Sequence, residues 1–588
     1  MPIIYIISTL ALFTLTILLK KTEKKLEIIK SITITLVLML SYNTLVCYIL
    51  NLVNIPITLA CLSIINIIIS IILGIKIIKS KNIQKYTINK INIIVVLLFI
   101  SIVTIVMNIN FGNLTKIRYI SMDAREHYKA AREFSENESL SNKAVTNNTT
   151  TGQLMPGAYT NVGIIFKVLQ PYVGTINLYK AFIIFEAFIY LLVGLMFYIL
   201  LEKYCNTINK KIIAITFSVL YILGYPLSAW ISGFHYLILG ILYIQTIIYT
   251  IMEKPKIEFD YELLMLFLLN LGLILSYSLF CPFVYLAEFI YYIQKYKKEK
   301  SKIKLFLSIL VTLILPGIIG VTYLIIPSIG KVGGFIALEG WVYKNLWSNF
   351  ILFIPFTIYY IYKNIKQKKL TFDNIILITL LTYMTILFIG TKVEKCSEYY
   401  FYKNYFILWL MLIYTSTQGM LQILNEKKAK HIANIYTVVY LVILVTQVCN
   451  YSKYVMVKAD DNLNEIMEIY KFNKTMICAK NAEFITKEEI QLYKETEKII
   501  KDKWKEQKEI LFVTDPTQER WIQSLTGYIN ILFDNVEYAI QNLQQENYKY
   551  IVTFENKETY KGLEKYINKE NMEKIYEIES GKIYERKN

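Results

Sequence analysis

Apolar residues along the chain gather in blocks of about 17 to 25, and polar segments separate the blocks. At 1.5 Å rise per residue, a helix of this length spans a hydrocarbon layer of roughly 30 Å and satisfies its own backbone hydrogen bonds there. The blocks predict about fourteen helices, over 3–19, 31–53, 57–75, 91–109, 175–201, 212–229, 235–252, 262–280, 282–294, 303–326, 347–362, 374–390, 404–422 and 432–450. We therefore expect a polytopic α-helical membrane protein with about 13–14 transmembrane helices.

The weakest of these predictions is 282–294, which begins at Pro282 and is short enough for a half-helix or a re-entrant segment. If it does not cross, the orientation of every later helix inverts. Composition agrees with a membrane solvent, because 55% of the 588 residues are hydrophobic and mean hydropathy is positive.

The net charge is +18, and the positions of the basic residues argue against nucleic acid as a partner. Lysines cluster in seven alternate loops, which follow the odd-numbered predicted helices. The positive-inside rule puts these loops in the cytoplasm, so the N-terminus and everything after residue 450 would lie outside. Heavy use of Ile, Lys, Asn and Tyr is typical of a low-GC bacterial genome, so we expect a bacterial plasma membrane.

The chain divides into three predicted regions: N-terminal helices over 1–90, the main membrane domain over 91–450 with a large extracytoplasmic loop at 110–174, and a small extracytoplasmic α/β domain over 451–588. Within the large loop, 159–169 is typical of a short amphipathic helix lying along the membrane interface. Further external loops are expected at 327–346 and 391–403. In the last region Thr486 and Glu489 form a capping box that opens a helix. Strands are predicted over 509–514, 548–554, 574–579 and 582–585, with a hairpin turn at Ser580-Gly581.

The segment Ser121 to Tyr128 carries the main candidates for catalysis, just after the fourth predicted helix. On a helix, Asp123, Glu126 and His127 fall at i, i+3 and i+4, so their side chains share one face. A carboxylate there can take a proton from an attacking hydroxyl, and a neighbouring Glu or His can orient it or bind a metal. The alternative is a solvated face on which Asp123 pairs with Arg125 or with a basic residue elsewhere.

The segment Lys392 to Lys403 leads from an external loop into a helix. Tyr399, Tyr400, Tyr402 and Lys403 put phenols and a cation at the membrane surface, where they could hold the phosphate of a lipid. An aromatic belt with a snorkelling lysine is the alternative, which is strong in a chain with 48 tyrosines.

Three further residues near or within helices are candidates. His235 could reach a substrate from the outer end of its helix, or it is an interfacial histidine with satisfied hydrogen bonds. Two carboxylates, Glu186 and Glu288, lie inside apolar spans, where acids are costly and default to functional hypotheses.

Together these residues resemble the GT-C superfamily of membrane glycosyltransferases, whose hallmark is an acidic residue in the first large extracytoplasmic loop. Asp123 matches the acidic position, Met155-Pro156-Gly157 matches a turn that many members carry, and Tyr399 to Lys403 resembles an aromatic and basic segment before a late helix. Two features depart from the pattern: the acidic loop follows the fourth helix, and no strict Asp-x-Asp or Glu-x-Asp pair is present.

The resemblance implies an inverting hexosyl or pentosyl transferase that takes a sugar from a polyprenyl phosphate donor to a glycan or protein acceptor at the external face. Asp123 would be the general base, while Lys403, helped by Tyr399, Tyr400 or Lys395, would stabilise the departing phosphate. No cofactor is certain, a divalent metal is an open option, and its ligands are unknown.

Two other functions stay open at this point. One is a transporter or flippase of lipid-linked glycans, in which Glu186 and Glu288 couple transport and Asp123 is dispensable. The other is a non-catalytic envelope assembly protein whose external domain binds partners.

Overall fold

A computed structural model provides the structure of the protein. It describes residues 1–22, 24–80, 83–121, 123–140, 155–253, 258–326, 347–367, 370–425, 430–449, 468–478, 485–503, 510–514, 516–527, 531–532, 537, 540–541, 548–554, 562–564, 567 and 572–587. The predicted external loop at 327–346 lies outside these residues.

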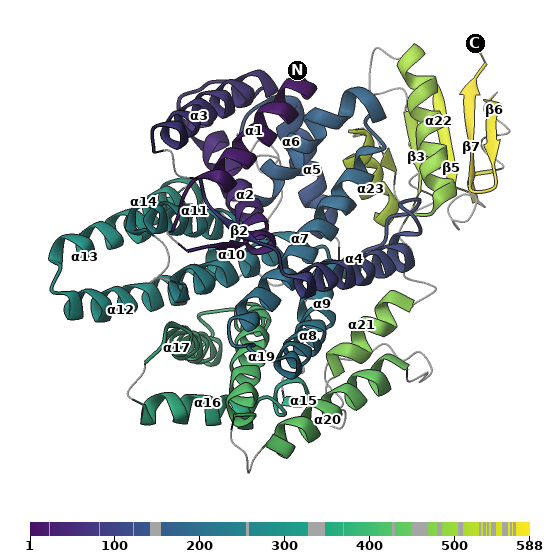
Figure 1. Cartoon of the computed structure of the whole chain (residues 1–588). Coiled ribbons are helices and arrows are strands. Elements are labelled where there is room, and N and C mark those ends of the chain that lie inside the picture. Colours follow the sequence, from purple (N-terminus) through teal and green to yellow (C-terminus); the bar gives the residue numbers. More distant parts are fainter. Residues whose placement is uncertain are drawn as a thin grey trace.

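The first half of the chain forms helices that pack side by side (Figure 1). These helices are α1 (Pro2–Leu18), α2 (Ile28–Leu52), α3 (Leu59–Ser80), α4 (Lys90–Phe111), α5 (Asp123–Asn137), α6 (Pro156–Val173), α7 (Leu178–Glu202), α8 (Ile208–Leu223), α9 (Tyr225–Ile231), α10 (His235–Met252) and α11 (Phe259–Tyr277). Two short parallel strands, β1 (Leu26–Glu27) and β2 (Tyr86–Thr87), join the loops before α2 and α4.

The second half of the membrane part continues the bundle. Its helices are η3 (Ser278–Phe280), α12 (Cys281–Glu299), α13 (Lys302–Ile309), η4 (Leu310–Ile314), α14 (Leu315–Gly320), η5 (Val321–Ile325), α15 (Trp347–Phe350), α16 (Ile354–Lys366), α17 (Phe372–Lys392), α18 (Glu398–Lys403), α19 (Tyr405–Ile423) and α20 (Lys430–Cys449). The doubtful segment 282–294 is helical throughout, since it lies within α12.

Ten helical stretches of the described chain are long and apolar enough to cross a membrane. One of them, Phe259–Glu299, contains two predicted spans that meet at η3, and Pro2–Leu18 and His431–Val445 are shorter apolar helices. The prediction of a polytopic membrane protein is thereby confirmed. Each of the fourteen apolar blocks is mainly helical, although 212–229 is divided between α8 and α9, 347–362 between α15 and α16, and 303–326 among α13, η4, α14 and η5.

The outer and the central helices of the bundle differ in how much of their surface is buried. Only 28% of the α3 and α4 spans is buried, whereas α7, α10 and α19 are buried on nearly all sides. Exposed isoleucines and leucines on α3 and α4 form an apolar outer surface that suits lipid. The central helices α7, α10 and α19 thus form the core of the bundle.

Helix α6 corrects one expectation from the sequence. The pattern over 159–169 predicted an amphipathic helix lying along the membrane interface. The helix is present, but most of its residues are buried, and it packs against α5, α2, α7 and α11. Gly163 permits this packing, because a Cβ there would lie 2.3 Å from Phe134 Cδ1.

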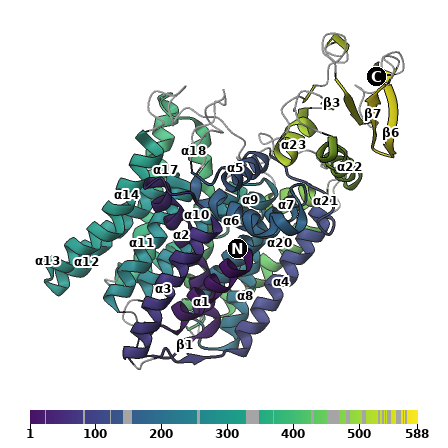
Figure 2. The same ribbon diagram turned by 90° about the horizontal axis from the view of Figure 1, so that it is seen from above.

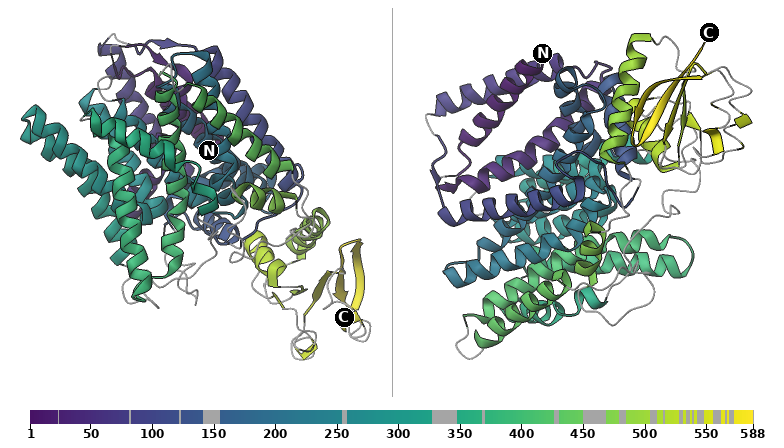
Figure 3. Two further views of the ribbon diagram at one scale, coloured as in Figure 1. Left: turned by 90° about the horizontal axis from the view of Figure 1, so that it is seen from below. Right: turned by 90° about the vertical axis from the view of Figure 1, so that its right-hand side faces the viewer.

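The C-terminal part forms a small α/β domain beside the bundle (Figure 3). Its elements are α21 (Glu468–Cys478), α22 (Lys487–Lys503), β3 (Ile510–Val513), α23 (Pro516–Thr526), β4 (Ile531–Leu532), β5 (Tyr550–Phe554), β6 (Met572–Ile578) and β7 (Gly581–Arg586). The strand order is β4-β3-β5-β7-β6, with parallel pairs at β3 and antiparallel pairs at β7.

The local predictions for this domain are confirmed. Thr486 N donates to Glu489 Oε2 at 2.8 Å and Glu489 N donates to Thr486 Oγ1 at 3.2 Å, so the capping box is closed in both directions. The predicted strands correspond to β3, β5, β6 and β7, and β6 and β7 meet at a turn over Glu579 and Ser580.

Candidate functional site

The first turn of α5 is held against the turn between α9 and α10. Ile120 N donates to Ile231 O at 2.8 Å, and Asp123 N donates to Ser121 Oγ at 3.2 Å, which starts the helix. Gly233 has a φ of +74°, and a Cβ there would lie 2.5 Å from Ala124 Cβ. Only glycine fits this close approach, which places Asp123 beside the start of α10.

Asp123 contacts a residue that sequence reasoning did not single out. Tyr236, in the first turn of α10, donates its hydroxyl to Asp123 Oδ2 at 3.1 Å. Arg125, the sequence-based candidate for an ion pair with Asp123, instead contacts Glu126 Oε1. The half-buried carboxylate of Asp123 is therefore oriented by a phenol.

Lys403 ends α18 and is fully buried. Its Nζ lies 3.3 Å from the ring centroid of Phe234, 5.0 Å from that of Tyr399 and 5.9 Å from that of Tyr236. Within the described chain, this ammonium has no hydrogen-bond partner. Aromatic faces stabilise a cation, but they do not replace the hydrogen bonds that it loses on burial.

Asp123 and Lys403 therefore meet at Tyr236, the carboxylate at its hydroxyl and the ammonium above its ring. Figure 2 shows α5, α9 and α18 together at one end of the bundle, next to α23. The two residues come from segments 280 positions apart in the chain, as their numbers show.

A second set of side chains lies directly behind this pair. The His127 ring is 4.5 Å from the His235 ring and 4.6 Å from the Tyr236 ring, between centroids. His235 Nδ1 lies 3.2 Å from Glu186 Oε1, and Tyr119 donates its hydroxyl to Glu186 Oε2. Glu186 thus lies between a histidine and a tyrosine.

Burial, together with neighbouring His235 and Lys403, lowers the pKa of His127 well below its usual range. The imidazole is therefore neutral at neutral pH, and it can accept or donate a hydrogen bond without adding a charge. Its Nδ1 has no hydrogen-bond partner in the described parts of the chain.

The C-terminal domain packs against this region. The Trp521 ring, on α23, stacks on Tyr119 at 6.1 Å between centroids and also contacts Tyr128. Arg132 donates to Gln523 O at 3.4 Å, and Ile117 and Ile485 exchange backbone hydrogen bonds of 3.1 Å. The domain thus contacts the loop that leads into α5.

The remaining candidates from the sequence have other contacts. The side chain of Glu126 is 36% exposed and faces Arg125. Lys395 is exposed, Tyr402 packs on Phe401 and Tyr405, and Tyr400 contacts Tyr399. His127, His235 and Tyr399, by contrast, are grouped with Asp123 and Lys403 around Tyr236.

No group of three or more His, Cys, Asp or Glu side chains that could hold a metal ion occurs among the described residues. His127 and His235 face each other, but the carboxylate of Glu186 lies behind His235. The geometry therefore offers polar groups for proton transfer and for binding an anion.

No family model matches the chain, and no curated protein matches it. Similar solved structures include ArnT from Cupriavidus metallidurans in the apo state, with a TM-score of 0.38 and 12% identity. The structure of the same protein bound to undecaprenyl phosphate gives a TM-score of 0.41 and 10% identity. Each alignment covers 83% of this chain and 97% of ArnT. Because both TM-scores are low, the function proposed below rests on contacts within this chain.

Proposed function

We propose that the protein is an inverting membrane glycosyltransferase of the GT-C type, which moves a sugar from a polyprenyl phosphate donor to a hydroxyl of a glycan or protein acceptor. The observation that carries this proposal is the ammonium of Lys403, which is buried, lacks a hydrogen-bond partner within the described chain and lies beside Asp123. An unpaired cation in a buried site is costly unless an anion completes it. A phosphate next to a carboxylate base is the arrangement that glycosyl transfer from a phosphate donor needs.

In the proposed reaction, Asp123 accepts the proton of the acceptor hydroxyl as its oxygen attacks the anomeric carbon. A new bond forms between that oxygen and the anomeric carbon, and the bond between the anomeric carbon and the phosphate oxygen breaks. The polyprenyl phosphate leaves with the bonding electrons, and Lys403 stabilises its growing negative charge. One displacement inverts the configuration of the sugar.

The neighbouring groups take positioning roles in this proposal. The hydroxyl of Tyr236 orients the carboxylate of Asp123 and leaves the second carboxylate oxygen for the acceptor. His127 and His235 lie beside the ring of Tyr236 and fix its position. Tyr399 lies close enough to Lys403 to donate its hydroxyl to the same phosphate.

The proposed orientation follows from the charge pattern. We place the lysine-rich loops in the cytoplasm of a bacterium, so the site and the C-terminal domain face outward. The predicted domain limits of 1–90, 91–450 and 451–588 are kept in this proposal. The lipid tail of the donor would then lie in the bilayer and its sugar at the outer surface.

The test is Asp123→Asn in a producing strain whose surface glycan is measured. The variant keeps the size of the side chain and an acceptor for Tyr236, but it removes the base, so we expect the modified glycan to disappear. Glu126→Gln is the matched control, since Glu126 is on the same helix face and pairs with Arg125. Unchanged glycan in Asp123→Asn, with normal protein levels in the membrane, would remove Asp123 as the base.

A further inference from the structure

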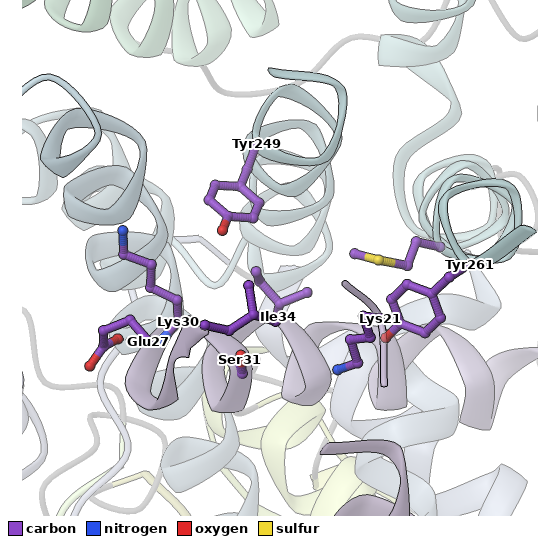
Figure 4. A pocket seen from close by; sticks show the side chains of 9 residues that line it. Lys21, Glu27, Lys30, Ser31, Ile34, Tyr249 and Tyr261 are labelled. Carbon is purple, nitrogen blue, oxygen red and sulfur yellow. Dashed lines mark hydrogen bonds between the residues drawn. The ribbon is translucent and has the colours of Figure 1, made fainter. Parts of the chain in front are cut away.

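A hollow in the surface lies far from the candidate site. Its wall includes Lys21, Glu27, Lys30, Tyr249 and Tyr261, which come from the loop after α1, from β1, from the start of α2, from the end of α10 and from the start of α11 (Figure 4). Tyr249 follows His235 along α10, so the two residues are about 20 Å apart at roughly 1.5 Å per residue. β1, beside the hollow, lies at the end of the bundle opposite α5 and α18 (Figure 2).

The loop that carries Lys21 is fixed by its backbone. Gln84 Oε1 accepts from Lys21 N at 2.9 Å and from Thr22 N at 3.2 Å, and Gln84 Nε2 donates to Lys24 O at 2.8 Å. Glu258 N donates to Lys21 O at 3.1 Å. These bonds hold the loop without using the side chain of Lys21, so a site there is preorganised.

The side chain of Lys21 is only 6% exposed. It pairs with no carboxylate in the described chain, and its Nζ lies 5.2 Å from the ring centroid of Tyr261. The Tyr261 hydroxyl is buried and has no hydrogen-bond partner among the residues that the structure describes. Burial lowers the pKa of Lys21 to about 8, which an anionic ligand would raise again.

On the other side of the hollow Lys30 has an ion-pair partner, whereas the carboxylate of Glu27 accepts through Oε2 and its Oε1 has no hydrogen-bond partner within the described chain. Lys30 Nζ lies 2.9 Å from Glu202 Oε2, and Glu27 Oε2 accepts from Lys30 N at 2.8 Å as the cap of α2. Figure 4 shows Glu27 and Lys30 on one side and Lys21 with Tyr261 on the other. Of the two lysines that line the hollow, Lys30 is thus paired and Lys21 has no carboxylate partner in the described chain, while Leu26, Ile34 and Met265 add apolar wall.

We propose that this hollow binds the phosphate of an anionic phospholipid, with Lys21 and Tyr261 as the groups that hold it. The ammonium supplies charge and a hydrogen bond, the phenol donates a second hydrogen bond, and the apolar wall takes the glycerol and the first acyl carbons. The site lies at the opposite membrane surface from Asp123, so it is separate from the proposed transfer reaction.

The test measures the thermal unfolding of the purified full-length protein in a mild detergent. Phosphatidylglycerol, phosphatidylcholine or inorganic phosphate is added to wild type, Lys21→Gln, Tyr261→Phe and the control Lys24→Gln. Lys24 is exposed on the same loop and does not line the hollow. We expect phosphatidylglycerol to raise the unfolding temperature of wild type and Lys24→Gln by about 2–4 °C.

The same lipid should raise the unfolding temperature of Lys21→Gln and Tyr261→Phe by less than half as much. Tyr261→Phe keeps the packing of the ring, so it serves even if Lys21→Gln folds poorly. An equal shift in all four proteins, or an equal effect of phosphatidylcholine, would overturn the proposal. A shift that depends on Lys21 and appears with inorganic phosphate alone would overturn the assignment to a lipid.

Discussion

Glu186 and Glu288 are both fully buried within apolar helices of the membrane part, and their surroundings differ. Glu186, on α7, lies between His235 and Tyr119, so it links His235 of the candidate site to the loop before α5. Glu288, on α12, accepts from Asn270 Nδ2 at 3.0 Å and from Tyr292 at 3.0 Å. The partners of Glu288 join α12 to α11, and Tyr292 in turn accepts from Thr312 on η4.

The difference shows that the burial of an acid in a membrane protein does not by itself mark a functional site. Glu288 has neutral donors on adjacent helices, so its network braces the packing of α11, α12 and η4. Glu186 contacts His235 and Tyr119, and both of these residues contact other side chains of the candidate site. We therefore treat Glu186 as a positioning residue for transfer and Glu288 as a structural residue.

The largest expected effect comes from replacing the two acids in parallel. Glu186→Gln removes the charge that orients His235, so we expect kcat for sugar transfer to fall about 10–100-fold, as for orienting groups behind a catalytic site. Glu288→Gln keeps hydrogen bonds to its neutral partners and should stay within about threefold of wild type, as expected away from the reacting atoms. Equal losses of kcat in both variants would show that the two acids do not differ in their roles.

The next effect concerns the C-terminal domain. Trp521→Ala removes the ring that stacks on Tyr119, whose hydroxyl donates to Glu186. We expect about tenfold lower transfer and faster proteolysis of the domain, since a buried Trp→Ala change costs roughly 3–5 kcal/mol of packing. Transfer at the wild-type rate with a released domain would show that the domain does not support the site.

Within the network of Glu288 the expected effect is on stability alone. Tyr292→Phe removes one hydrogen bond to the carboxylate, so the free energy of unfolding should fall by about 1–3 kcal/mol. Transfer by the variant should match wild type at temperatures where both are folded, which paired melting and activity curves would check. A selective loss of transfer would place Glu288 in the functional group of residues.

The smallest expected effect is a dependence of stability on pH at His127. Because the folded state lowers the pKa of His127, the unfolded chain binds a proton more readily, and this opposes folding below about pH 6.5. Above that pH neither state is protonated, and the effect vanishes. His127→Gln should therefore lose less stability than wild type between about pH 7 and pH 5, as measured by thermal unfolding.

Much of the fold could be predicted from local patterns. The span predicted at 235–252 coincides with α10, because its apolar block begins after Gly233 and ends at Glu253. The capping box at Thr486 and the hairpin turn at Ser580 were predicted for the same reason, since both depend on neighbouring residues. The burial of α6 could not be predicted, because a moderately polar helix is buried only when neighbouring helices provide hydrogen bonds for its polar groups.

The site could be predicted only in part. Asp123, His127, His235, Tyr399 and Lys403 were expected on one membrane surface, and the structure groups them. Their meeting point could not be predicted, because Tyr236 is one of 48 tyrosines and its bond to Asp123 joins residues 113 positions apart. One feature of the sequence does point to Tyr236, because it directly follows His235 at the predicted outer end of a helix.

In the proposed function, the buried ammonium of Lys403 binds the phosphate of a lipid beside Asp123, the proposed general base. The most direct measurement is the binding of undecaprenyl phosphate to the purified full-length protein, by calorimetry or native mass spectrometry. Lys403→Met keeps the apolar contacts with Phe234 and removes the charge, so we predict at least about tenfold weaker binding, whereas Asp123→Asn should bind as wild type does. Wild-type affinity in Lys403→Met would contradict the account.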